Sequence, residues 1–434
     1  MANTFRSLFG REDNNSSISL SIRHFRNRIE TDPAIPLIVI SLGILLTASS
    51  GSWDITNHLL NRPETFFSPP HAGLYSGVIL VLFGSLMTYR YYRRGNKVSD
   101  NNNNRKSLPT YLRLILLGIV MLISAGPLDF AWHTAFGLDG LLSPPHAVLT
   151  MGMVLCSIGA FLGLISNNNY SDKMRTKTNI ERLDDGDSYS TFELKNTSSN
   201  NTTTPSIRSS LYIIVSITAI WITVSGIIHM ASLPFSDTDF FKFNPNPILA
   251  GLIATLCFPF LVSFVLFTSW EITKKFGVLT ATGMIFIFIN LITTILPNEN
   301  LVPAIPFYLI NVIPIIAIDA LLSLPSLGIL SSSSTPSSTT TISISLSQTR
   351  KRIVSILAGA VLGLTFFMLY FPLITHTYNE VATDPQPVWP SVTATIYFEM
   401  IDEMYPILVI SSIAAGILGV VVSSKLTGGL YHRI

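Results

Sequence analysis

Ten long apolar stretches are the feature of this sequence that most restricts what it can fold into. A hydrocarbon core about 30 Å thick is crossed by about 20 helical residues, and a crossing segment must satisfy its own backbone hydrogen bonds. The sequence therefore predicts an all-α, polytopic integral membrane protein of about ten transmembrane helices, embedded in the lipid bilayer. The stretches lie near residues 34–58, 71–92, 109–133, 146–166, 209–231, 247–269, 277–296, 303–323, 352–373 and 406–424.

The charge composition agrees with a membrane location and excludes one class of partner. Only 12% of the 434 residues are charged, about half the share usual in a soluble domain. The formal net charge of +2 leaves no basic excess of the kind that binds nucleic acid. Both cysteines, Cys156 and Cys257, fall inside apolar runs, so we expect neither a disulfide framework nor a cysteine metal site.

The distribution of positive charge predicts the orientation of the chain. With the N-terminus inside, 25 of the 27 Lys and Arg residues fall on the inner side of the ten helices, and only Arg62 and Lys242 fall outside. This bias predicts a multi-pass protein of the cell membrane with both termini in the cytoplasm. The expected organisation is a cytoplasmic segment (1–32), a duplicated metal-binding membrane region (33–166), a disordered cytoplasmic linker (167–207), a second membrane region of six helices (208–425) with a low-complexity loop (324–351), and a cytoplasmic tail (426–434).

The first four predicted helices contain two copies of one hairpin. Residues 51–80 and 126–155 superpose with a uniform offset of 75 and no gap. Because each copy has two helices and returns to its starting side, the copies are parallel repeats. The equivalent residues are Gly51 and Gly126, Asp54 and Asp129, His58 and His133, Ser68 and Ser143, Pro69 and Pro144, Pro70 and Pro145, and His71 and His146.

Each copy carries the pattern Asp-x3-His-x12-His. Residues four apart share one face of a helix, and the second His begins the returning helix at the same depth. The preceding Ser-Pro suits a helix start, with Ser as N-cap and Pro in the first turn. An aspartate with two neutral imidazoles suits copper, zinc or iron with one position left open. The predicted metal ligands are Asp54, His58 and His71 in the first copy, and Asp129, His133 and His146 in the second.

The alternative interpretation of the pattern is purely structural. Ser-Pro-Pro-His would then be a helix-start cassette, and each Asp–His a buried hydrogen-bonded pair. We favour metal binding, because ionisable groups inside a membrane are costly and generally functional, and because all three ligands recur at identical spacing.

The pattern resembles the copper motif in the membrane C subunit of particulate methane and ammonia monooxygenases. The residues that carry the resemblance are Asp54, His58 and His71, and again Asp129, His133 and His146. It covers about one hairpin at a time, and the chain differs from that family in length, helix count and the tandem Ser-Pro-Pro-His. The resemblance implies copper as cofactor, with zinc or iron as alternatives, and oxidation of a small substrate by dioxygen.

Three further residues are possible accessories to the site. His229 lies near the outer end of the fifth predicted helix. The hairpin that this helix begins resembles an eroded third copy of the repeat. Asp319 lies within the eighth predicted helix and could belong to an ion or proton path. His376 lies in an acidic outer loop that could attract cations or cover the metal region.

Three functions remain open at this point. The leading one is an outward-facing metal-binding protein, a monooxygenase-like oxidase or a subunit of one, acting on a small substrate. The second is a protein that transports or acquires a metal ion. The third is a non-catalytic subunit that depends on other subunits of a membrane complex. The sequence does not show whether the two triads form one dinuclear site or two separate sites.

Overall fold

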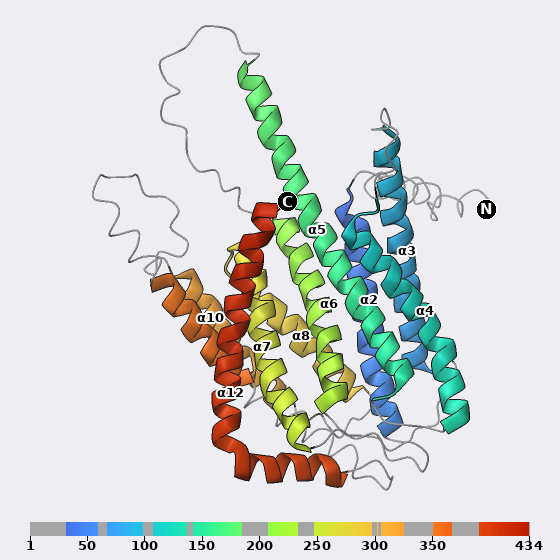
Figure 1. The fold of residues 1–434 in the computed structure, drawn as a ribbon, viewed down its shortest axis with the longest axis vertical. Coiled ribbons are helices and arrows are strands. Elements are labelled where there is room, and N and C mark those ends of the chain that lie inside the picture. Colours follow the sequence, from blue (N-terminus) through green and yellow to red (C-terminus); the bar gives the residue numbers. More distant parts are fainter. Residues whose placement is uncertain are drawn as a thin grey trace, which may run out of the picture.

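The computed structural model describes most of the ten predicted stretches and little of the segments that connect them. The described residues are 32–59, 67–98, 107–136, 142–184, 207–232, 247–296, 302, 305–324, 350–366 and 390–433. Their helices are α2 (Ala34–Leu59), α3 (Pro69–Val98), α4 (Thr110–Phe136), α5 (Pro144–Asp184), α6 (Ile207–Ser232), α7 (Pro247–Thr273), α8 (Val278–Ile295), α9 (Ile305–Ile310), α10 (Val312–Ser323) and α12 (Pro390–Arg433), with a further helix over residues 350–366. The described part contains no strand, which confirms the all-α class (Figure 1).

Eight of the described helices are long and apolar enough to cross a membrane. They coincide with eight of the ten predicted stretches and support a membrane-embedded protein. Their apolar spans are Ala34–Asn57, Pro69–Arg94, Thr110–Phe136, Pro144–Asn167, Arg208–Ser232, Leu249–Thr273, Val278–Ile295 and Pro406–Gly429.

The other two predicted stretches have a different form. The stretch 303–323 is divided at Asn311 into α9 and α10. Pro314 has no N–H to donate to the carbonyl of Ile310, so a continuous helix would lose a hydrogen bond here. The stretch 352–373 is helical over residues 350–366, and the rest of it lies outside the described residues.

Helices α2 to α5, which contain the two repeat copies, form an antiparallel four-helix bundle. Helix α2 packs against α3 and α5, and α4 packs against the same two helices. Helices that follow one another in the chain are therefore neighbours, and the contact between α2 and α5 closes the bundle (Figure 1). This is the up-down-up-down arrangement that short connections favour.

Equivalent glycines hold both hairpins at the same close distance. A Cβ at Gly43 would lie 2.8 Å from the carbonyl oxygen of Gly77, and a Cβ at Gly118 would lie 2.7 Å from that of Gly152. Only glycine allows this approach, which is typical of membrane helix pairs. Gly118 and Gly152 follow Gly43 and Gly77 at the same offset of 75. The duplication therefore extends into helix packing beyond the motif from which it was predicted.

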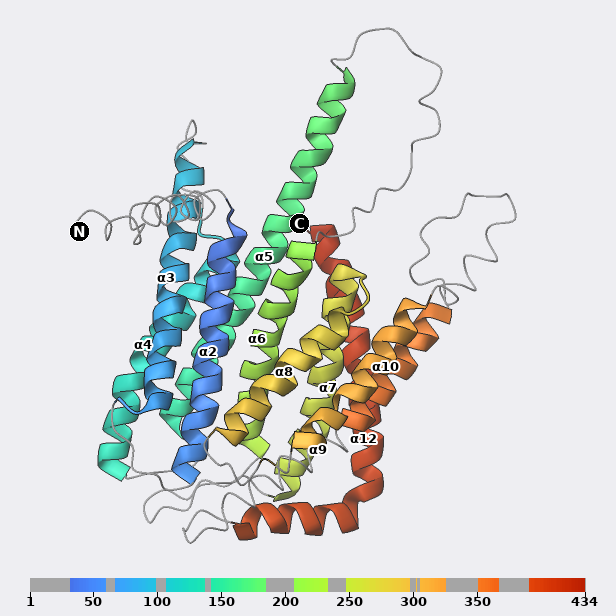
Figure 2. The same ribbon diagram turned by 180° about the vertical axis from the view of Figure 1, so that it is seen from behind.

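The second half of the molecule packs against the bundle through α6. Helix α6 contacts α2 and α5 on one side and α7 and α8 on the other. Trp221 of α6 stacks on Phe286 of α8, with ring centroids 4.0 Å apart, and both side chains are buried. Figure 2 shows α8 and α10 side by side on the face away from α12.

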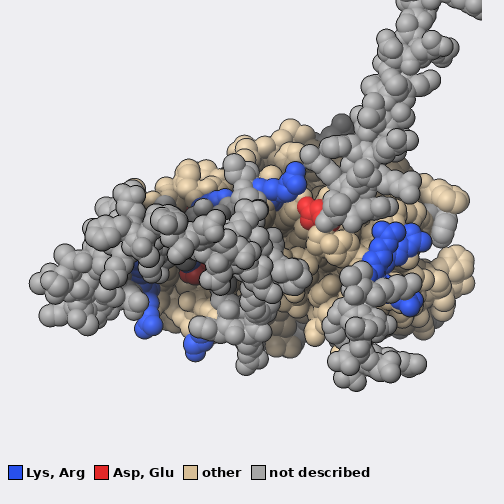
Figure 3. Space-filling view, turned by 90° about the horizontal axis from the view of Figure 1, so that it is seen from above, with Lys and Arg blue, Asp and Glu red and all other residues tan. Residues whose placement is uncertain are grey.

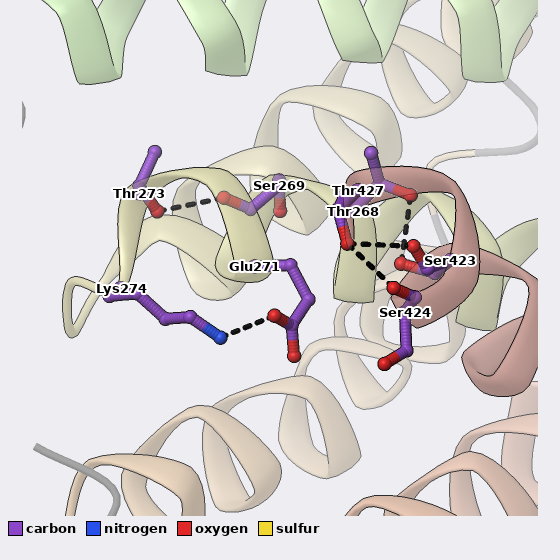
Figure 4. Close-up of polar contacts among 8 residues, drawn as sticks. All are labelled: Thr268, Ser269, Glu271, Thr273, Lys274, Ser423, Ser424 and Thr427. Atoms are coloured by element: carbon purple, nitrogen blue, oxygen red, sulfur yellow. Dashed lines mark hydrogen bonds and ion pairs between the residues drawn. The ribbon is translucent and has the colours of Figure 1, made fainter. Parts of the chain in front are cut away.

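Helix α12 changes direction and then runs along α7. Its first part lies below the lower end of α7 in Figure 1, and Pro406 is inside the helix where the apolar span begins. A proline removes one backbone hydrogen bond and commonly kinks a helix. At the other end, the Thr268 hydroxyl of α7 donates to Ser423 of α12 at 3.0 Å (Figure 4).

Positive charge gathers at one end of the bundle, which we call the basic end. Figure 3 shows Lys and Arg side chains on this end of the molecule, and each described Lys or Arg is near the terminus of its helix that lies at this end. Among them, Lys274 pairs with Glu271 (Figure 4) and lies 3.9 Å from the ring centroid of Trp270. The opposite end, which we call the motif end, holds Asp54 and Asp129. The basic residues are Arg90, Arg93, Arg94, Arg113, Arg208, Lys274, Lys275, Arg350, Lys351, Arg352 and Lys425.

Candidate metal centre

The second repeat copy brings its three predicted ligands together. Asp129, His133 and His146 each offer one ligand atom, and these atoms lie within 4.8 Å of one another. The Nε2 atoms of His133 and His146 are each 3.4 Å from Oδ1 of Asp129. His146 is buried and the other two residues are partly buried, with the Asp129 side chain 36% exposed. A carboxylate that faces two imidazoles at this spacing can accept a metal ion between them.

The helix-start cassette positions His146 as the sequence predicted. Helix α5 begins at Pro144, and the carbonyl of Ser143 accepts the N–H of Ala147 at 2.9 Å. The backbone N–H of His146 donates to the Ser143 hydroxyl oxygen at 3.4 Å. Ser143 is therefore the N-cap, and the prolines occupy the first turn, where their missing N–H groups are tolerated. The cap fixes where the His146 ring leaves the helix.

The first repeat copy uses the same cassette and forms a closer pair. Helix α3 begins at Pro69, and the carbonyl of Ser68 accepts the N–H of Ala72 at 2.9 Å. The Nε2 atom of His71 lies 2.9 Å from Oδ1 of Asp54. His58 is part of α2, but its side chain lies outside what the structure describes. Two of the three predicted ligands are therefore brought together in this copy.

The two copies lie beside each other at the motif end. Helix α2 of the first copy packs against α5 of the second, and α3 packs against α4. Within the described residues, only the second copy gathers three ligands close enough to share one ion. The described residues therefore contain one gathered triad, in the second copy, and one Asp–His pair, in the first.

A cavity of about 150 Å³ adjoins both copies at the junction of the two halves. Asp54 of the first copy and His146 of the second both line it. His229 of α6 lines it as well, and its ring lies 4.8 Å from that of Phe258. The predicted accessory His229 is thus near the triad, although the 4.8 Å group does not include it.

Of the other two predicted accessory residues, Asp319 lies away from this region and His376 is not described. Asp319 of α10 is fully buried near the basic end and accepts hydrogen bonds from the backbone N–H of Thr280 at 2.9 Å and from its hydroxyl at 2.7 Å. Thr280 is in the first turn of α8, so Asp319 caps that helix from a neighbouring one. His376 lies outside the described residues.

Sequence reasoning missed the cavity and several of its polar residues. Asn290 and Thr294 of α8 and Tyr308 of α9 line it, and the Thr294 and Tyr308 hydroxyls are 3.0 Å apart. Their signal in the sequence is weak, because a single Asn, Thr or Tyr in an apolar helix is common. Only the packing of α8 and α9 against the repeat bundle shows that they share one space.

Comparison with protein-family models gives no match for this chain. Searches of curated proteins and of solved structures give no match either. The resemblance to the copper motif of the monooxygenases therefore rests on the residues of the motif alone.

Proposed function

We propose that this protein binds a transition-metal ion in the membrane at Asp129, His133 and His146. The observation that supports it is the gathering of three ligand atoms within 4.8 Å at the meeting of α4 and α5. An aspartate and two histidines inside a membrane are energetically unfavourable unless they pair with one another or bind a ligand. A metal ion uses all three at once, and three protein ligands leave a coordination position for water or substrate.

The equivalent residues Asp54, His58 and His71 form the second site of the proposal. The Asp54–His71 pair is already in contact at 2.9 Å, and His58 is in the same helix as Asp54 at the i+4 position. Binding in this copy requires the ion to separate that pair. We therefore assign the tighter site to the second copy.

Copper is the metal we propose, with zinc and iron as alternatives. Imidazole and carboxylate ligands suit all three, and copper(II) binds such sites most strongly among the divalent metals of the first transition row. Bound copper would supply redox chemistry toward dioxygen and a small substrate, as the resemblance to the monooxygenase motif implies. In this proposal Asp129 sets the charge of the site and Ser143 holds His146 in position.

The proposed setting is the cell membrane, with the motif end outside and the termini in the cytoplasm. The gathering of all described Lys and Arg side chains at the basic end supports this orientation, since positive residues favour the cytoplasmic side. Partners in a membrane complex belong to the same proposal.

Elemental analysis of the full-length protein, purified in mild detergent, tests the metal site. We expect stoichiometric metal in the wild type and loss of metal when His58 and His133 are both changed to Ala. The matched control is Thr134→Ala, since that exposed hydroxyl donates only to the carbonyl of Phe130 in its own helix, at 2.7 Å. Metal-free wild type, or equal metal in the double variant, would overturn the proposal. Electron paramagnetic resonance of the loaded protein identifies copper(II).

A further inference from the structure

The cavity at the junction of the two halves carries an inference that goes beyond metal binding. Its lining comes from α2, α3, α5, α6, α8 and α9, so it exists only where the repeat bundle meets the rest of the molecule. A volume of about 150 Å³ matches cavities that hold a molecule about the size of benzene. It is too large to be filled by one water molecule.

Three hairpins each carry a polar residue three positions after a glycine, and two of them place both residues at the cavity. The repeat copies present Asp54 and Asp129 three residues after Gly51 and Gly126, and α6 presents His229 three residues after Gly226. Helices α6 and α7 form the third antiparallel pair of the chain. Gly51 and Gly226 both line the cavity, together with the polar residue that follows each of them. His229 is therefore the third hairpin's counterpart of the two aspartates.

Two residues that line this cavity each have a buried imidazole nitrogen that lacks a hydrogen-bond partner among the described residues. The nitrogens are Nδ1 of His146 and Nε2 of His229. Nε2 of His146 faces Asp129, and a histidine engaged through one nitrogen normally donates the N–H of the other. The Ser225 hydroxyl, which is also part of the lining, lacks a partner within the described residues too. Buried polar groups of this kind generally have a ligand or water as partner.

The rest of the lining defines the chemical class of the ligand. The apolar part of the lining includes Leu149 and Met153 of α5 and Phe286 of α8. None of the described residues that line the cavity is a Lys or Arg, so nothing there compensates the charge of an anion. The site suits a compact molecule with a hydrocarbon part and one hydroxyl or carbonyl group.

We propose that this cavity binds a small uncharged organic molecule of about the size of phenol. Its hydrocarbon part packs against Leu149, Met153 and Phe286, and its polar group forms hydrogen bonds with His146 and His229. Because His146 also belongs to the triad, the bound molecule lies next to the metal site. The cavity and its unsatisfied nitrogens support this binding site whether or not metal is bound.

Fluorine NMR of the full-length protein in lipid nanodiscs tests the site, with 4-fluorophenol as the polar probe and fluorobenzene as the apolar probe. We expect saturable binding of 4-fluorophenol by the wild type, with about tenfold preference over fluorobenzene, the size of effect that one hydrogen bond gives. Gly51→Leu should abolish binding of both probes, because a side chain here meets no atom within 4 Å and enters the cavity. His229→Leu should remove the preference for 4-fluorophenol.

Gly126→Leu is the matched control, since Gly126 is the equivalent position in the other copy, also has open space around it, and does not line the cavity. It should bind both probes as the wild type does. Absence of saturable binding in the wild type, or unchanged binding in Gly51→Leu, would overturn the inference, as would an unchanged preference in His229→Leu. Metal content measured on the same samples keeps the two proposals separate, because Gly51 offers no metal ligand.

Discussion

Nε2 of His71 lies 2.9 Å from Oδ1 of Asp54, whereas the equivalent atoms of His146 and Asp129 are 3.4 Å apart. The first distance is a close ion-pair contact, and the second leaves the two groups farther apart. In the second copy, His133 lies at the same 3.4 Å from the same oxygen. One carboxylate oxygen of Asp129 is thus equally distant from two imidazoles. The two copies share one motif, but the second is better arranged to receive an ion.

Asp129→Asn should weaken metal binding more than Asp54→Asn does. The amide preserves the shape of the side chain but removes the negative charge that two imidazoles face in the second copy. We expect at least about a tenfold loss of affinity for Asp129→Asn, comparable to the loss of an important group at a metal site. Competition with a chelator of known affinity measures it. Equal losses in the two variants would contradict the ranking of the sites.

Replacing the N-cap serine should have a larger effect in the second copy than in the first. Ser143 accepts the N–H of His146, while the Ser68 hydroxyl has no hydrogen-bond partner among the described residues. Loss of an N-cap typically costs about 1 kcal/mol, so Ser143→Ala should lower the free energy of unfolding by about that amount and Ser68→Ala by less. Thermal unfolding of the purified variants measures the difference. We also expect Ser143→Ala, and not Ser68→Ala, to weaken metal binding, because the cap positions the His146 ring.

Much of this arrangement is predictable from short-range patterns. Apolar runs long enough to cross a membrane define eight of the described helices. The cassettes before His71 and His146 mark helix starts because N-capping depends only on a few consecutive residues. Identical spacing predicts the meeting of Asp129 with His133 and His146, since all three belong to one hairpin.

What the sequence does not predict depends on packing between distant segments. The local sequence suggests His229 as an accessory residue, but its place in the same cavity as Asp54 follows from the packing of α6 against α2 and α5. Asp319 reads as an isolated charge in an apolar helix, and its role follows from Thr280, which is 39 residues away in the chain. The division of α9 from α10 at Asn311 was also missed, because the apolar run continues through it.

Gly152→Ala should destabilise the second hairpin, whereas Gly126→Ala should not. A Cβ at Gly152 would lie 2.9 Å from the carbonyl oxygen of Gly118, a backbone atom that moves only if the helices separate. Overpacking of this kind costs about 1–3 kcal/mol. At Gly126 the added methyl meets no atom within 4 Å, and replacing a helical glycine by alanine favours the helix by about 1 kcal/mol. Thermal unfolding should therefore shift in opposite directions in the two variants. A stabilised Gly152→Ala would show that α4 and α5 do not pack at this distance.

Substitutions at Asp319 separate helix capping from metal passage. Its carboxylate accepts both the N–H and the hydroxyl of Thr280 at the start of α8, so Asp319→Ala should lower the free energy of unfolding by about 2–3 kcal/mol, the scale for buried groups left without a partner. Thr280→Val removes the hydroxyl but keeps the N–H, and we expect a loss of about 1 kcal/mol.

Both variants should retain the metal content of the wild type, because Asp319 is near the basic end and the triad is at the motif end. Metal uptake into vesicles that contain the full-length protein provides the decisive comparison for Asp319→Asn, which keeps one oxygen to accept from Thr280. If Asp319 is a cap, this variant loses some stability and takes up metal as the wild type does. Loss of metal-dependent uptake without loss of stability would instead assign Asp319 to an ion path and favour transport over oxidation.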